Sequence, residues 1–201
     1  MSKRRETVQY RCPQCKINRQ WCFCTELKQI ELKVPTTVIK HVRERKLSSN
    51  TVTLSKLVLP KIKIIEHGAI GSTSTQYAPA PSEQPLYLYP SAEAITLKEA
   101  KTIYKDKKLA LVIPDGSWRQ TKKFHRRIAG LQDIPHVKIS DPPKSQYALR
   151  TQKDPWALCT LEAMAYAFKE LGDEHSCEVL LDALILHNER GLMARAKLSP
   201  K

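Results

Sequence analysis

The stretch LALVIPDGSWRQTKKFHRR, residues 109–127, combines an apolar run, a turn and a basic segment. Residues 109–114 are apolar throughout, which is typical of a strand covered on both faces in a parallel sheet. Asp115 and Gly116 then suit a tight turn, and Ser117 suits the cap of a following helix. This order of elements indicates a strand that leads through a short turn into a basic helix.

The rest of the chain alternates between the same two kinds of pattern. Strands are predicted over 34–41, 61–68, 85–91, 109–114 and 136–140, and helices over 48–60, 92–106, 117–130, 156–171 and 176–197. This alternation predicts an α/β fold with a mostly parallel sheet flanked by helices on both faces. Ligands of such sheets bind outside the carboxyl ends of the strands. We therefore expect the functional site in the loops after Tyr89, Pro114 and Ser140.

Composition narrows the class of protein. The chain has 201 residues, of which 41% are hydrophobic, and its formal net charge is +14. This content supports a packed core, and the charge favours an anionic partner, most commonly nucleic acid. No apolar run reaches the ~18 residues of a membrane helix, and no apolar segment follows the charged N-terminus as in a secretory signal. A cytoplasmic, reducing location is expected.

Four of the six cysteines lie in CPQCKINRQWCFC, residues 12–24. Two close pairs separated by a short interval predict a tetrahedral zinc site, formed by Cys12, Cys15, Cys22 and Cys24. Unrelated reduced thiols are the alternative, which this clustering disfavours. Four protein ligands leave no open position, so the zinc is expected to be structural. We expect two units, a zinc module over 1–30 and an α/β domain over 31–201.

A stripe of positive charge follows Trp118. Its residues recur at spacings of three and four, which places them on one helical face, and no acid interrupts them. A solvated face is the alternative, but uncompensated like charges favour contact with phosphates. The segment KHVRERK, residues 40–46, is a second cluster. The expected RNA-binding residues are Lys40, Arg43, Arg119, Lys122, Lys123, Arg126 and Arg127.

Asp115 is the candidate for chemistry. A carboxylate at the end of a strand can accept a proton or orient a cationic ligand, and the spacing does not distinguish the two. The structural alternative is a turn, a helix cap and a tryptophan that fills the core. From the residues alone, the expectation is a zinc-containing α/β protein with a polyanionic partner and a pocket at Asp115.

Several stretches resemble the DTW-domain family. DGSW, residues 115–118, is similar to its D-x-T-W signature, with a serine that retains the hydroxyl of the threonine. The cysteine segment, HVRERKLSSNT (41–51), KSQYALR (144–150) and CTLEA (159–163) match further family segments in the same order. Members look like tRNA-uridine aminocarboxypropyltransferases, which move the 3-amino-3-carboxypropyl group of S-adenosylmethionine to N3 of a uridine. The fold implied is similar to the knotted SPOUT type.

The resemblance also implies roles for individual residues. Asp115 is expected to be the general base, or else the anchor of the donor's ammonium group. The residues expected to bind S-adenosylmethionine are Tyr89, Pro90, Ser91, Gly116, Ser117, Trp118, Tyr147, Leu149, Arg150 and Thr160. Two other functions stay open at this point, namely a SPOUT-like RNA methyltransferase and a non-catalytic zinc RNA-binding protein.

Overall fold

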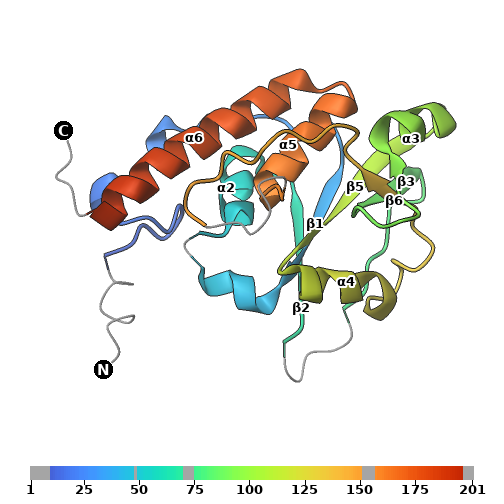
Figure 1. Ribbon diagram of the computed structural model, residues 1–201, viewed down its shortest axis with the longest axis horizontal. Coiled ribbons are helices and arrows are strands. Elements are labelled where there is room, and N and C mark those ends of the chain that lie inside the picture. The colour runs from blue at the N-terminus through green and yellow to red at the C-terminus, as the bar shows by residue number, and fades with distance from the viewer. Residues whose placement is uncertain (1–9, 48, 70–74, 151–156, 197–201) are drawn as a thin grey trace.

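The computed structural model describes residues 10–47, 49–69, 75–150 and 157–196, which form a sheet covered by helices (Figure 1). The strands are β1 (Thr36–His41), β2 (Lys63–His67), β3 (Glu83–Leu88), β4 (Ile95–Thr96), β5 (Lys108–Asp115) and β6 (His136–Lys138). The α-helices are α2 (Thr51–Val58), α3 (Leu97–Ile103), α4 (Trp118–Arg127), α5 (Thr160–Glu170) and α6 (Glu174–Ala196). Short 3-10 helices are η1 (Arg19–Trp21), η2 (Cys24–Glu26) and η3 (Val42–Lys46).

The six strands lie in the order β2-β1-β5-β3-β6-β4, and each neighbouring pair is parallel. The predicted α/β fold with a mostly parallel sheet is confirmed. β5 lies inside the sheet between β1 and β3, which explains why residues 110–113 are apolar and buried. The carboxyl end of β5 therefore has a strand on each side, and Asp115 at this end lies opposite Lys40 of β1. The knotted chain path implied by the resemblance stays a prediction.

The two faces of the sheet are covered unequally. The side chains of Val38, Leu111 and Ile113 point to a large apolar cluster that includes residues of α2, α3, α5 and α6. The alternate residues Ile39 and Val112 point to a smaller cluster built around α4. Figure 1 shows α5 and α6 on one side of the sheet and α4 on the other. Helices on both faces were expected, and the alternation of the strand residues accounts for this arrangement.

The segment 92–106 differs from the prediction of one helix. Ile95 and Thr96 pair with β6 as the short strand β4, and α3 begins only at Leu97. The backbone N–H of Glu99 donates to the Thr96 hydroxyl at 3.1 Å, and the Glu99 carboxylate accepts from the Thr96 backbone at 2.7 Å. This capping box fixes the start of the helix at Leu97, five residues later than predicted.

The N-terminal segment packs beneath α6, which contacts η1. Buried Ile17, Trp21 and Phe23 belong to the same apolar cluster as α5 and α6. The boundary between residues 1–30 and 31–201 as separate units stays a prediction. No helix among the described residues is both long and apolar enough to cross a bilayer.

Candidate active site

A pocket of about 680 Å³ lies where the carboxyl ends of β3, β5 and β6 meet the starts of α2, α4 and α5. Its wall includes Asn50 at the start of α2, Tyr89 after β3, Asp115 at the end of β5 and Thr160 at the start of α5. The loops after Tyr89, Pro114 and Ser140 were expected to form the site, and residues of all three line this pocket.

Asp115 is held by two neutral donors and is only 5% exposed. The Thr160 hydroxyl donates to its Oδ1 at 2.6 Å, and Asn50 Nδ2 donates to its Oδ2 at 2.8 Å. Burial raises the pKa of Asp115 above its ordinary value, and the two hydrogen bonds act in the opposite direction. The result is an oriented carboxyl group in the pocket wall whose proton affinity is increased by desolvation.

Charged neighbours surround Asp115 at longer range. Lys40 of β1 lies opposite it in the sheet register and is itself buried, at 6% exposure. Buried Glu44 of η3 forms an ion pair with Arg150 at 3.2 Å, and Arg150 lines the pocket. The charge of Glu44 raises the pKa of Asp115 and that of Lys40 lowers it, although burial is the larger cause. Among the described residues, Asp115 itself forms no ion pair.

The start of α4 places an exposed indole at the pocket. Gln120 Oε1 accepts from the Ser117 backbone at 2.8 Å and from its hydroxyl at 2.9 Å, so Ser117 caps α4 as expected. Trp118, the first residue of the helix, is 59% exposed and contacts the Tyr89 ring edge-on at 5.9 Å. The interpretation of Trp118 as a core side chain is therefore wrong. An exposed tryptophan beside a pocket is available to a ligand.

The loop over 144–150 is held against α5 by Glu162, which is fully buried. Its carboxylate accepts from the Ser145 hydroxyl at 2.7 Å and from the backbone N–H groups of Gln146 and Cys159 at 2.6 and 2.8 Å. Tyr147 in this loop donates its hydroxyl to the Ser49 carbonyl at 2.6 Å and lines the pocket. Sequence reasoning missed Glu162, although its position three residues after the helix cap was the signal.

Most of the residues expected at the donor site line this one pocket: Tyr89, Pro90, Asp115, Gly116, Ser117, Trp118, Tyr147, Arg150 and Thr160. Two others lie outside its wall. The Ser91 hydroxyl is hydrogen-bonded to His136 Nδ1 at 2.6 Å, and Leu149 is buried against Gly191 of α6.

The basic residues of α4 are all exposed, as is Arg43 of η3. These side chains, namely Arg43, Arg119, Lys122, Lys123, Arg126 and Arg127, are therefore available to phosphates. Lys40 differs from them, because strand β1 buries its side chain on the same face of the sheet as Asp115. We do not propose a phosphate contact for it.

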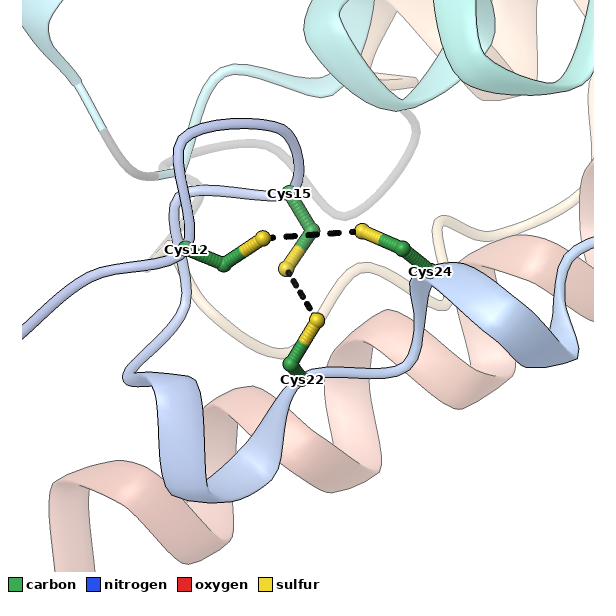
Figure 2. Close-up of side chains that lie close together, drawn as sticks. All are labelled: Cys12, Cys15, Cys22 and Cys24. Atoms are coloured by element: carbon green, nitrogen blue, oxygen red, sulfur yellow. Dashed lines mark hydrogen bonds between the residues drawn. The ribbon is translucent and has the colours of Figure 1, made fainter.

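The four clustered cysteines converge on one point (Figure 2). The Sγ atoms of Cys12 and Cys24 lie 3.7 Å apart, those of Cys15 and Cys22 lie 4.0 Å apart, and all four lie within 4.8 Å of one another. Four sulfurs bonded to zinc at ~2.3 Å in a tetrahedron are ~3.8 Å apart. The donor set and its spacing therefore fit a zinc ion bound by Cys12, Cys15, Cys22 and Cys24.

Known proteins resemble this chain over most of its length. The DTW domain family matches residues 9–191. The tRNA-uridine aminocarboxypropyltransferase 2 of Drosophila melanogaster is 28% identical over 162 residues, which cover 77% of this chain and 64% of that protein. The protein of the same name from Macaca fascicularis is 28% identical over 169 residues, 80% of this chain and 56% of that protein.

The chain thus spans less than two thirds of the length of either curated relative. A solved structure, the SAM-dependent rRNA:acp-transferase Tsr3 from Vulcanisaeta distributa, is 17% identical with a TM-score of 0.45. That alignment covers 82% of this chain and 80% of the other. Because the family match extends over most of its length, this chain belongs to the DTW-domain family.

Proposed function

We propose that this protein transfers the 3-amino-3-carboxypropyl group of S-adenosylmethionine to N3 of a uridine in tRNA. The observation that carries the proposal is the buried Asp115 carboxyl, oriented by Thr160 and Asn50 in a large pocket of a DTW-family chain. The names of the two curated relatives support the transfer of an aminocarboxypropyl group to uridine in tRNA.

The reaction needs a base and an oriented donor. The sulfonium of the donor activates the γ-carbon of its methionine chain. A bond forms between uridine N3 and this carbon, the carbon–sulfur bond breaks, and its electron pair stays on sulfur, so neutral methylthioadenosine leaves. The proton on N3 must go to a group in the pocket, and correct alignment of the γ-carbon supplies much of the acceleration.

Asp115 takes the proton in this proposal. Desolvation increases its affinity for a proton, which brings a carboxylate closer to the range where a general base works at neutral pH. Thr160 and Asn50 fix both of its oxygens, so that the remaining lone pairs point in defined directions. An anchor for the donor's ammonium group is the rival role, and it predicts weakened donor binding instead of an altered pH dependence.

The pocket wall supplies the donor's other contacts. The exposed ring of Trp118 packs against the methyl or adenosyl end of the donor, and Tyr89 supports that ring. Ser117 and the backbone at Gly116 bind the donor's carboxylate. Arg150, partly neutralised by Glu44, lies at the same wall and binds either the donor or a phosphate.

RNA reaches this pocket along α4. N3 lies on the Watson–Crick edge of uridine, so the base must be unpaired or flipped out before it reacts. The exposed cations of α4 follow directly after Trp118 and would hold the neighbouring phosphates. The cysteine cluster would hold a structural zinc ion, and cysteines that are not joined in disulfides suit a reducing compartment such as the cytoplasm.

The proposal is tested by identifying the adenosine-containing compound that S-adenosylmethionine leaves behind after the transfer. The protein is incubated with S-adenosylmethionine and unmodified tRNA, and the adenosine-containing products are separated by chromatography. We expect methylthioadenosine that accumulates only when tRNA is present, and its loss in the Asp115→Asn variant. S-adenosylhomocysteine instead would indicate a methyltransferase, and no product would indicate a non-catalytic RNA-binding protein.

A further inference from the structure

A second cavity, of about 240 Å³, lies between the cysteine segment and α6. We call it the seam cavity and define it by Arg11, Lys16, Asn18, Ser49, Leu149 and Arg195 among its lining residues. It is separate from the pocket at Asp115, and the proposed reaction assigns it no role. Its position between two parts of the chain makes it a candidate binding site.

Positive charge concentrates on the wall of the seam cavity. Arg11, Lys16 and Arg195 line it, and no aspartate or glutamate belongs to its lining. Within the described residues, none of these three cations forms an ion pair. Lys16 donates to the Pro13 carbonyl and Arg195 to the Leu149 carbonyl, which leaves further N–H donors on each group. Three cations without a carboxylate favour an anionic ligand.

The backbone at Lys16 has an unusual conformation. Its φ of 63° is the only left-handed value at a non-glycine residue among the described residues. Glycine adopts this conformation at lower cost, so a lysine here is a strained choice. The turn is closed by hydrogen bonds from the Lys16 backbone to the Cys12 carbonyl at 3.1 Å and from the Cys12 backbone to the Ile17 carbonyl at 2.8 Å, and it places Lys16 beside the cysteine cluster in the wall of the seam cavity.

The seam cavity lies next to the active-site pocket. Ser49 lines both, and its carbonyl accepts from the hydroxyl of Tyr147 in the active-site wall. Leu149, two residues further on, lines the seam cavity. A Cβ atom on Gly191 of α6 would lie 2.3 Å from Leu149 Cδ1, so the helix and this dividing loop are packed tightly together. A strand of RNA that extended from the active-site pocket past Ser49 would meet these three cations.

We propose that the seam cavity binds a backbone phosphate of the RNA strand that carries the target uridine. This inference rests on the proposed function, because it assumes that RNA enters the active-site pocket. Arg11, Lys16 and Arg195 would hold the phosphodiester beside Ser49, the residue that the seam cavity shares with the active-site pocket. The zinc-bound fold of the cysteine segment would then fix two of the three cations, Arg11 and Lys16, in place.

The test compares tRNA binding by matched charge variants of the full chain. Lys16→Gln/Arg195→Gln removes two charges at the seam cavity. Lys105→Gln/Lys107→Gln removes two exposed charges at the opposite, amino-terminal end of β5 and is the control. Fluorescence anisotropy with labelled unmodified tRNA gives the dissociation constant over a range of salt concentrations. Zinc content and the thermal midpoint confirm that each variant is folded.

We expect the seam variant to bind tRNA several-fold more weakly. The slope of the logarithm of the binding constant against the logarithm of the salt concentration should decrease by about one unit for each phosphate contact removed. Arg195→Lys, which keeps the charge, should retain the salt slope. Isothermal titration with inorganic phosphate alone should show no saturable binding. Saturable phosphate binding that the seam variant abolishes would assign the cavity to free phosphate and overturn the proposal.

Equal weakening in the seam and control variants would also overturn the proposal, because total charge would then explain the effect. Failure of this inference is distinguishable from failure of the proposed function. If the wild-type chain alters uridine and the seam variant binds like the control, only the inference fails. If the wild-type chain alters no uridine but the seam variant still loses tRNA binding, the proposed function fails, while the seam cavity remains a site for RNA phosphate.

Discussion

The hydrogen bond from Thr160 to Asp115 offers the sharpest test of the proposed base. Thr160→Val replaces the hydroxyl with a methyl group of similar size and removes the 2.6 Å hydrogen bond to Oδ1. Asn50 remains as the donor to Oδ2. The hydrogen bond from Thr160 favours the ionised carboxylate, so its removal raises the pKa of Asp115 further.

The size of the effect follows from the burial of the pair. A hydrogen bond to a charged group contributes about 1.5–3 kcal/mol, and about 1.4 kcal/mol corresponds to one pH unit. Asp115 is 5% exposed, so solvent does little to screen the loss. We expect the acidic limb of the pH–rate profile to move to higher pH by about one to two units. Activity should fall most below neutral pH and recover as the pH rises.

The assay measures kcat/KM for tRNA from pH 5 to 9, in wild type, Thr160→Val and Thr160→Ser. Thr160→Ser retains the hydroxyl and should restore the wild-type limb. An unchanged limb in Thr160→Val would refute the role of Asp115 as the base. A raised KM for S-adenosylmethionine with an unchanged limb would identify Asp115 as an anchor for the donor instead.

Three further outcomes follow from the structure. Burial raises the pKa of Asp115, so the folded protein loses stability as the pH rises through that pKa and the carboxyl group ionises. Asp115→Asn stays neutral and should therefore raise the thermal midpoint in calorimetry at neutral pH. A lowered midpoint would contradict this. Removal of metal with a chelator should lower the midpoint and release one zinc ion per chain, measured by mass spectrometry, and an unchanged midpoint would argue against a structural ion. Gly191→Ala should lower the unfolding free energy by about 1–3 kcal/mol in denaturant titration, because its Cβ would overlap the Leu149 side chain. A smaller loss than that caused by replacing an exposed residue with alanine would show that the loop at Leu149 moves aside freely.

The sequence was most informative where a local pattern and the topology agree. The apolar run of β5 predicted a covered strand, and the parallel sheet then placed Asp115 at its carboxyl end beside a pocket. Ser117 was expected as a helix cap and performs that role. The cysteine spacing predicted a shared metal site, and the four Sγ atoms converge.

Partners distant in sequence were not predictable in the same way. Asn50 is the N-cap residue of α2, but its side chain makes no capping hydrogen bond and donates instead to Asp115, 65 residues away. Lys40 belonged to a basic cluster, but its place in β1 buries it. In both cases the tertiary neighbour decides the direction of the side chain, and local periodicity carries no information about that neighbour.

The central claim is that this chain attaches an aminocarboxypropyl group to uridine. Its most direct test is mass spectrometry of nucleosides from unmodified tRNA that has been incubated with the protein and S-adenosylmethionine. We expect a uridine heavier by one 3-amino-3-carboxypropyl group, with the substituent on N3, and no such product from Asp115→Asn. Uridine that gains only a methyl group, or no mass at all, from any tRNA would contradict the account.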